Sequence, residues 1–481
     1  LFAELAIRRT DYWKKASREQ LFLGNPLRFR EMRCVLSFVL PADEIKERDL
    51  DAILEIRSEM ISILKSMNMF SHVWIGTELI RWTRKLLNPH LLFQLENNMN
   101  EGEYDELRPL HHQIIASNTL MRVMDSGEEL VFGSKKHNTK IAVRSFSIGD
   151  YPNQFHLGEF TNLLGSPVYS SINYPCPFLI TICARRTEYD KEKAIAQLKF
   201  SRAAQVAGTK IGSMSPEFAK RAADWSVAQE SFEDGAGGLM HLHMQLTLFD
   251  TVDNLDNSTA MAHKIWKSKG FELYADDYLQ AQDLQLALPM AMDNDMMGDL
   301  DRFKRWHTKT MTNLLSLSPV VGDWSGVGEP VIGLVSRRGQ VMGFDLFANN
   351  SGNYNAAIVG ASGSGKSFFV NQIASGYCAN GAKVWIIDVG RSYEKLCHTI
   401  GGQYIEFGVN SNLVINPFDT VNNIDEDIEI LKLLLSLMIA PNEGLSDYQL
   451  PILSKVIREV WDASAKEATI DDVAERLVAY S

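Results

Sequence analysis

Apolar residues recur along this chain with two different periods, and the two periods predict different elements. Apolar positions three or four residues apart predict helices over 48–68 and 192–207, because that spacing places the side chains on one face of a helix. The stretch 239–250, LMHLHMQLTLFD, alternates with period two and predicts a strand. The apolar runs 32–41 and 177–186 predict two further strands. This part of the chain is therefore expected to be a mixed α/β structure.

A stretch dense in turn-forming residues divides the chain. Residues 316–330, SLSPVVGDWSGVGEP, contain three glycines and two prolines, and these residue types mark linkers and loops. We therefore expect an amino-terminal α/β domain for docking and assembly over 1–325 and a second domain over 326–481. The second domain opens with 331–347, whose pattern predicts a pair of strands.

The pattern around residue 360 predicts a strand, a loop, a helix and a second strand in succession. Residues 356–359 are wholly apolar and 383–388 are mostly so. Short apolar runs of this kind are typical of parallel strands that are buried on both faces. Between them, Phe369, Ile373 and Tyr377 recur every four residues and predict a helix with one buried face.

Amphipathic patterns near the end of the chain predict two helices. They cover 424–440 and 447–464, and each has an apolar stripe at helical spacing. We expect them to form a helical insertion, over about 424–464, in the second domain.

No second apolar strand that ends in acidic residues is predicted after 383–388. Enzymes that hydrolyse nucleoside triphosphates at a phosphate-binding loop, the motif described below at 360–367, need such a strand because its carboxylates hold Mg²⁺ and orient water. The stretch 412–419, NLVINPFD, comes nearest, but Pro417 interrupts it and no second acid follows. Because the chain also begins without Met, we expect it to be part of a longer protein whose water-orienting carboxylate lies beyond residue 481.

The composition is that of a folded globular protein, and it disfavours several classes of protein and of site. The 481 residues are 45% hydrophobic and 22% charged, with a net charge of −12, and this length predicts more than one domain. The acidic balance disfavours a surface that grips nucleic acid over its whole extent. No run of eighteen apolar residues predicts a membrane span. The five cysteines have no CxxC spacing, so neither a zinc site nor a disulfide framework is predicted.

The most specific motif is GASGSGKS at 360–367, which fits the phosphate-binding pattern GxxxxGK[ST]. Its three glycines are predicted to adopt positive φ angles and to bring the backbone close to an anion. The amides of residues 363–367 would converge on the phosphates at the start of a helix. Lys366 would contact the β- and γ-phosphates, and the Ser367 hydroxyl would ligate Mg²⁺. We assign ATP and Mg²⁺ as cofactors, Lys366 as catalytic, and nucleotide binding to Gly360, Ala361, Ser362, Gly363, Ser364, Gly365, Lys366, Ser367 and Phe368.

Three charged residues after the second apolar run are further candidates. Asp388 ends that run, and ligands of open α/β sheets bind outside the carboxyl ends of strands. Asp388 is therefore a candidate partner of Mg²⁺ through water; the alternative is a cap on the turn that follows. Arg391 and Glu394 can reach the γ-phosphate of this subunit or of a neighbour. The alternative for both is a solvated start of a helix.

Other features favour structural roles over sites. His241 and His243 lie two apart on a predicted strand, but no third ligand is near in sequence, so strand packing is favoured over a metal. The basic stretch 185–221 can face DNA or lipid, although a solvated helix face is favoured. The stretch 8–15, RRTDYWKK, mixes basic and aromatic residues. A contact at an interface is the less favoured interpretation of it. The methionine-rich 290–299 is expected to be a flexible loop, with a partner surface as the alternative.

Several motifs together resemble the TraC-type ATPases of conjugative type IV secretion systems. They are SRRGQVMGFDLF, the P-loop stretch, AKVWIIDVGRSYEKLC, GGQYIEF and NLVINPFD. The resemblance implies a RecA-like P-loop motor domain, incomplete here, after an amino-terminal domain that contacts the secretion machine. It also implies an oligomeric, usually hexameric ATPase, cytoplasmic and peripheral at the inner membrane, that drives pilus assembly and substrate transfer. The implied partners are other copies of itself, inner-membrane components of the secretion system, and pilin or another protein substrate.

Two other functions share the same motif. One is a DNA-translocating motor of the FtsK or coupling-protein kind, which the acidic charge and the absence of a predicted membrane span disfavour. The other is a scaffold that binds ATP without hydrolysing it, because the family's second acidic motif and later arginine have no counterpart in this sequence. Contact with DNA stays open.

Overall fold

The structure is a computed structural model that describes most of the chain. The described residues are 2–17, 29–40, 46–67, 69, 71–92, 104–134, 137–169, 171–209, 216–233, 238–319, 321–327, 329–349, 352–407 and 415–480. They form two compact units, Leu1–Val384 and Trp385–Ser481. The expected division at residues 325 and 326 stays a prediction.

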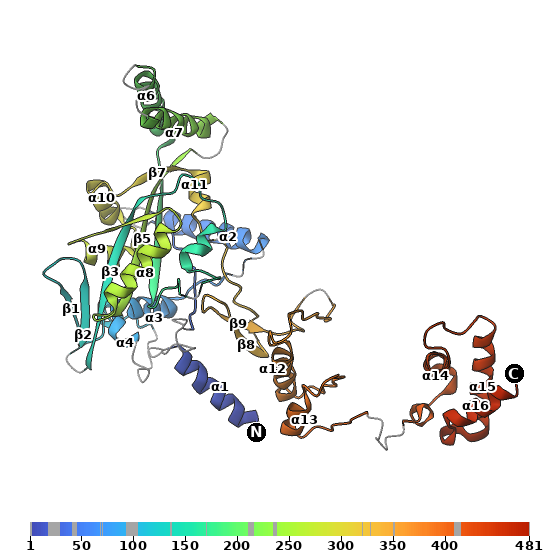
Figure 1. Ribbon diagram of the computed structural model, residues 1–481. Coiled ribbons are helices and arrows are strands. Elements are labelled where there is room, and N and C mark those ends of the chain that lie inside the picture. Colours follow the sequence, from blue (N-terminus) through green and yellow to red (C-terminus); the bar gives the residue numbers. More distant parts are fainter. Residues whose placement is uncertain are drawn as a thin grey trace. The chain divides into compact units, whose positions relative to one another are not determined.

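The first unit is built around an antiparallel sheet of seven strands (Figure 1). Five of the strands follow the order β1-β2-β3-β5-β4, while β6 pairs with β3 and β7 pairs with β5. Their bounds are β1 Thr119–Val123, β2 Leu130–Ser134, β3 His137–Asp150, β4 Phe178–Arg186, β5 Leu239–Thr251, β6 Glu272–Ala275 and β7 His307–Thr310. The strands predicted over 177–186 and 239–250 are therefore confirmed as β4 and β5.

The central strand β5 is buried on both faces, although its sequence alternates with period two. Its residues from Leu242 to Asp250 are all buried, so the polar positions of the alternation also lie inside. They are accommodated by hydrogen bonds: Gln245 Nε2 donates to Asp283 O at 2.7 Å, and the Thr247 and Ser145 hydroxyls are 2.9 Å apart. The alternation therefore predicted the strand correctly, while its polar residues form internal contacts.

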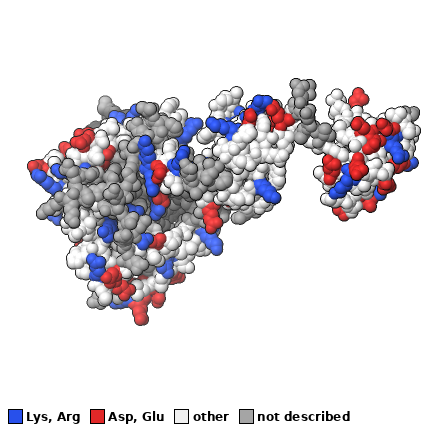
Figure 2. All heavy atoms as spheres, turned by 90° about the horizontal axis from the view of Figure 1, so that it is seen from below, with Lys and Arg blue, Asp and Glu red and all other residues white. Residues whose placement is uncertain are grey.

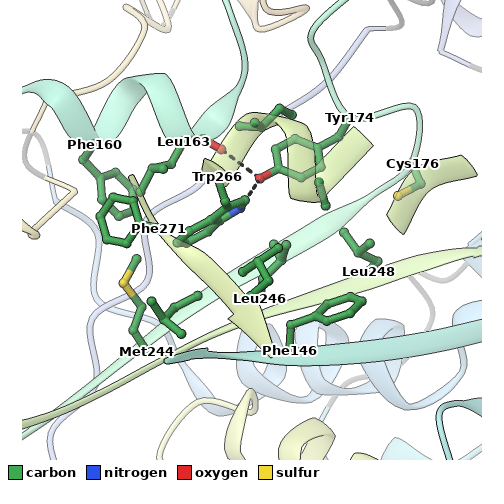
Figure 3. Close-up of a cluster of buried hydrophobic side chains, with 14 of the residues drawn as sticks. Phe146, Phe160, Leu163, Tyr174, Cys176, Met244, Leu246, Leu248, Trp266 and Phe271 are labelled. Carbon is green, nitrogen blue, oxygen red and sulfur yellow. Dashed lines mark hydrogen bonds between the residues drawn. The ribbon is translucent and has the colours of Figure 1, made fainter. Parts of the chain in front are cut away.

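One apolar core of the first unit lies between the sheet and helix α8 (Leu255–Lys267). Trp266 at the end of α8 is fully buried, and its Nε1 donates to the Tyr174 hydroxyl at 2.7 Å. That hydroxyl donates in turn to Leu163 O at 2.9 Å, as Figure 3 shows. These bonds satisfy the polar atoms of two large aromatic side chains, which is the condition for burying them at little cost.

Helices surround the sheet and extend from it (Figure 1). The predicted helices at 48–68 and 192–207 are confirmed as α2 and α6, apart from residue 68, which lies outside the described residues. The helices of this part are α1 Phe2–Ala16, α2 Glu47–Ser66, α3 Gly76–Leu87, α4 Pro89–Leu92, α5 Leu110–Ile114, α6 Tyr189–Ala207, α7 Pro216–Glu233, α8, α9 Gln280–Leu286, α10 Asn294–Arg302 and α11 Met311–Ser316, with the 3₁₀ helix η1 Glu159–Leu164.

A separate two-stranded sheet precedes the phosphate loop. Strands β8 (Ile332–Val335) and β9 (Val341–Phe344) pair in antiparallel register. The strand pair predicted over 331–347 is therefore confirmed. Helix α12 (Lys366–Ala379) follows and lies against this hairpin.

Three predicted strands are wrong. Residues 32–40 form no strand (residue 41 lies outside the described residues), and residues 356–359 and 383–388 are coil with exposed side chains; Val359 is 93% exposed. A strand gains its stability from ladder hydrogen bonds to a neighbour, and in the described part of the chain none of these runs has a partner strand. The apolar composition of these runs suggested buried strands, but composition does not determine whether a neighbouring strand lies beside them.

The second unit contains a bundle of three helices, α14 (Ile424–Ile439), α15 (Gln449–Ser464) and α16 (Ile470–Val478). The two predicted helices are confirmed as α14 and α15. Their apolar stripes meet in a core that includes Leu431 and Ile457. Acidic residues outnumber basic ones here, and their side chains are red in Figure 2. The unit also holds α13 Glu394–Ile400 and the 3₁₀ helices η3 Pro417–Thr420 and η4 Ala465–Glu467.

A helix that crosses a bilayer needs about 20 consecutive, mainly apolar residues. The helices of this chain do not meet that requirement in the part that the structure describes.

Candidate nucleotide-binding site

The loop 360–367 has the backbone that its glycines predict, with one exception. Gly363 and Gly365 have φ angles of 77° and 94°, in the left-handed region that favours glycine. Gly360 does not have a positive φ. It is instead confined by a close approach, because an added Cβ would lie 2.5 Å from the Ser364 Oγ. The expected positive φ at Gly360 is therefore wrong, since tight folding of the loop on itself is what disfavours a side chain there.

Lys366 folds back across the loop. Its Nζ donates to the carbonyl oxygens of Gly360 at 2.6 Å and Ala361 at 3.0 Å. These bonds hold the ammonium against the backbone at the start of the loop. The positive charge of Lys366 therefore lies next to the loop amides that would bind an anion.

Helix α12 begins at Lys366, with Gly365 as its N-cap. Its first amides are not used by preceding turns of the helix, so they are free to bind an anion, with the helix dipole in support. Ser367 and Phe368 of the first turn are exposed, Phe368 by 76%. An added Cβ at Gly363 or Gly365 would meet no atom within 4 Å, so the outer side of the loop is open to a ligand.

These features fit a nucleotide with Mg²⁺. The loop is exposed, its glycine conformations leave room, and the lysine and the Ser367 hydroxyl lie at its helix end. The remaining assigned residues, Ala361, Ser362 and Ser364, are exposed on the same loop. The structure thus brings together the nine residues assigned to nucleotide binding, while their individual contacts with ATP stay predictions.

Helix α12 packs against the hairpin of β8 and β9, and the sequence pattern of the helix did not predict this contact. The predicted buried stripe of Phe369, Ile373 and Tyr377 is only half-buried, and the buried positions are Ala374 and Gly376. The helix approaches the hairpin closely because Gly376 has no side chain. Sequence reasoning missed this contact; a glycine inside a helical pattern was the one sign of it.

Asp388 lies in the second unit and caps the turn that follows it. Its Oδ2 accepts a hydrogen bond from the Ser392 amide at 2.6 Å. The residue is exposed and does not end a buried strand, so the capping alternative is what the structure shows. A contact of Asp388 with Mg²⁺ through water stays a prediction.

Arg391 and Glu394 border a shallow hollow in the same unit. Arg391 has a left-handed φ of 60° and forms an ion pair with Glu406. The hollow has a volume of about 490 Å³ and is lined by Arg391, Glu394, Lys395, His398 and Thr399. The predicted reach of these residues to a γ-phosphate stays untested.

The histidine pair on β5 has the structural role that was favoured. His243 is buried, and its ring nitrogens lie 3.3 Å from Arg305 O and 3.4 Å from Gln245 Oε1. His241 lies 3.1 Å from the Arg185 guanidinium. Within the described ranges no group of three or more His, Cys, Asp or Glu side chains is placed to hold a metal ion.

Comparison with known proteins finds relatives for both parts of the chain. A family model described as "TraC protein" matches residues 1–292, and one described as "TraG P-loop domain" matches residues 339–480. "Protein TraC" of Escherichia coli (strain K12) is 23% identical over 486 residues, which cover 97% of this chain and 53% of that protein. The chain thus spans about half the length of the curated relative that it matches.

Proposed function

Since the chain belongs to the TraC protein family, we propose that it is part of an ATPase motor of a bacterial conjugative type IV secretion system. The motor hydrolyses ATP to drive pilus assembly and substrate transfer. The observation that carries this proposal is the loop 360–367, with Lys366 folded over it at the start of α12. The match of residues 339–480 to a P-loop domain supports it.

The loop residues have distinct roles in the proposed reaction. The amides of residues 363–367 bind phosphate oxygens, because they lie in the loop and at the start of α12, where the positive end of the helix dipole favours an anion; the Ser364 amide gives up its bond to Ala361 O to do so. Lys366 exchanges its bonds to the Gly360 and Ala361 carbonyls for the β- and γ-phosphates. Its charge then stabilises the phosphoryl group in transfer to water.

Ser367 is the residue that would hold Mg²⁺. Its hydroxyl lies in the first turn of α12, exposed and beside the lysine. The ion, when bound, neutralises charge on the β- and γ-phosphate oxygens. Asp388 is proposed as a further partner of Mg²⁺ through water.

The remaining parts of the proposal follow the family. The P-loop domain is a RecA-like motor, α14 and α15 are a helical insertion in it, and the region over 1–325 docks on the secretion machine. Copies of the protein assemble, as a hexamer, at the cytoplasmic face of the inner membrane. They contact inner-membrane components of the secretion system and handle pilin or another protein substrate.

The test is steady-state ATP turnover by the full-length oligomer, with and without single- and double-stranded DNA. The variant is Lys366→Ala, and its matched control is Lys383→Ala, which removes an exposed lysine outside the loop. Turnover that is lost only in Lys366→Ala and is unaffected by DNA supports the protein-handling motor. Strong stimulation by DNA would replace it with a DNA translocase, and tight ATP binding without turnover would replace it with a scaffold.

A further inference from the structure

The hairpin of β8 and β9 is held between α12 and α1. Successive residues of a strand face opposite sides of a sheet, and two neighbours on β8 make the two contacts. An added Cβ on Gly376 of α12 would approach the Ile332 Cγ2 to 2.7 Å. An added Cβ on Gly333 would lie 2.3 Å from the Cζ2 of Trp13 in α1. The two helices therefore press on opposite faces of the same small sheet.

The end of α12 is tied to the residues that follow β9. The Tyr377 hydroxyl donates to Asp345 Oδ1 at 2.6 Å and accepts from the Leu346 amide at 2.7 Å. The Phe347 ring meets the Tyr377 ring edge-on, with centroids 5.3 Å apart. These directional contacts set the position of the helix along the hairpin.

The turn of the hairpin holds the chain that follows α1. The Arg30 amide donates to Gly339 O at 2.8 Å, and the Val341 amide donates to Arg30 O at 3.1 Å. The Met32 amide donates to Gln340 Oε1 at 2.6 Å. Arg30 and Met32 thus bond the segment 29–32 directly to the hairpin, while Phe29 also contacts α1: its ring centroid lies 4.8 Å from that of Trp13, and its amide donates to Ala16 O at 3.2 Å.

The same turn also reaches the region around the large sheet. Arg338 is buried, its Nε donates to Gly165 O at 2.9 Å, and its guanidinium is ion-paired with Asp323. Gly165 directly follows η1, whose Leu163 belongs to the core of the sheet. Contacts from α12, α1, segment 29–32 and the loop after η1 thus converge on one hairpin; Figure 1 shows β8 and β9 beside α12.

We propose that this hairpin passes the effect of nucleotide binding to the amino-terminal part of the protein, and that Tyr377 is the residue that positions α12 on it. The proposal rests on the proposed function, because it needs a nucleotide at the loop. Helix α12 begins at Lys366 and is one unbroken element of 14 residues, so a shift of its first turn moves its far end. The contacts of α12 and α1 on the two faces of the hairpin are the route by which that shift would pass.

The experiment is amide hydrogen exchange of the full-length protein with and without ATP and Mg²⁺. The readout is the nucleotide-dependent change in two regions, α1 and segment 29–32, and ATP affinity is measured on the same samples. Wild type is expected to show the change in both regions. Tyr377→Phe keeps the ring but removes the hydroxyl, so it is expected to lose most of both changes while ATP affinity stays within about twofold.

Two further variants separate the proposal from a loss of folding. Trp13→Ala is expected to lose the nucleotide-dependent change in α1 and to retain it at residues 30–32, because Arg30 and Met32 have their own bonds to the hairpin, whereas Phe29 loses its contact with the Trp13 ring. Tyr448→Phe removes an exposed hydroxyl in the second unit and should behave as wild type. General destabilisation by Trp13→Ala would affect both regions.

Three outcomes would overturn the inference. The first is a wild-type protein that binds ATP without any change in α1 and segment 29–32, which leaves the proposed function intact. The second is a full nucleotide-dependent change in both Tyr377→Phe and Trp13→Ala. The third is a wild-type protein that binds no ATP, and in that case the proposed function fails as well.

Discussion

Gly376 of α12 approaches Ile332 of β8 so closely that no side chain fits between them. An added Cβ would lie 2.7 Å from Ile332 Cγ2 and 3.0 Å from Val331 Cγ1. The helix that carries the phosphate loop is therefore seated on the hairpin at a point where only glycine is tolerated.

Gly376→Ala is predicted to destabilise the protein. The added methyl group has to displace α12 from β8, and overpacking of this kind costs about 1–3 kcal/mol. The measurement is the free energy of unfolding in urea. The matched control is Gly298→Ala in α10, where an added Cβ meets nothing within 4 Å; it should be neutral or stabilise by up to about 1 kcal/mol. Equal effects of the two substitutions would contradict the close contact.

Ser367→Ala is predicted to lower the apparent affinity for Mg²⁺ in ATP turnover. Without the hydroxyl, the Mg²⁺ concentration for half-maximal ATP turnover should rise about tenfold, a loss of about 1.4 kcal/mol. Ser367→Thr is the control, because threonine keeps the hydroxyl and fits the same motif, and it should stay near wild type. An Ala variant whose Mg²⁺ titration matches that of the Thr variant would remove Ser367 from the metal site.

Arg337 and Arg338 are adjacent in sequence, but their substitution is predicted to change stability by very different amounts. Arg338 is buried and paired with Asp323, whereas Arg337 is exposed. Arg338→Gln leaves the carboxylate of Asp323 without its partner, and breaking a buried pair in this way costs about 3–5 kcal/mol. Arg337→Gln should change stability by less than about 0.5 kcal/mol. Unfolding in urea measures both, and a small loss in Arg338→Gln would argue against a buried pair.

His243 is predicted to make stability depend on pH. Burial, helped by the Arg305 guanidinium, lowers the pKa of His243 to about 4, against about 6.5 in an unfolded chain. Between these values the unfolded state binds a proton that the folded state does not. Stability is therefore full above about pH 6.5 and falls as the pH drops toward 4, by at most about 3 kcal/mol.

The check is the thermal unfolding midpoint at several pH values across that window. His243→Gln removes the titrating ring and should reduce the pH dependence, while His241, His263 and His307, whose pKa values burial also lowers, keep part of it. His398→Gln changes an exposed histidine of the second unit and should leave the dependence as in wild type. A slope that is unchanged in His243→Gln would show that other groups cause it.

Local patterns predicted the helices α2, α6, α12, α14 and α15 and the hairpin of β8 and β9, but not the other helices that the structure describes. The amphipathic patterns of α6, α14 and α15, and the strand pair at 331–347, were readable because the side chains that define them are near in sequence. The same is true of the loop 360–367, where the lysine, the serine and the glycines fall within eight positions. These features need no distant partner to be recognised.

The failures share a cause. The runs 32–40, 356–359 and 383–388 have strand-like composition, but whether such a run becomes a strand depends on a neighbour that its own sequence does not specify. Asp388 is a similar case. It was placed at the end of a strand on the strength of its position, whereas its carboxylate caps the turn at Ser392.

The sequence alone determined the family and the P-loop motif, because each motif rests on residue types and spacing within a short segment. Only the tertiary structure decided which residues hold that segment in place. Contacts of Gly376 with Ile332, Tyr377 with Asp345 and Trp13 with Gly333 join residues far apart in the chain. No local pattern encodes such contacts, because they arise from close packing of whole elements, and that packing exists only in the folded chain.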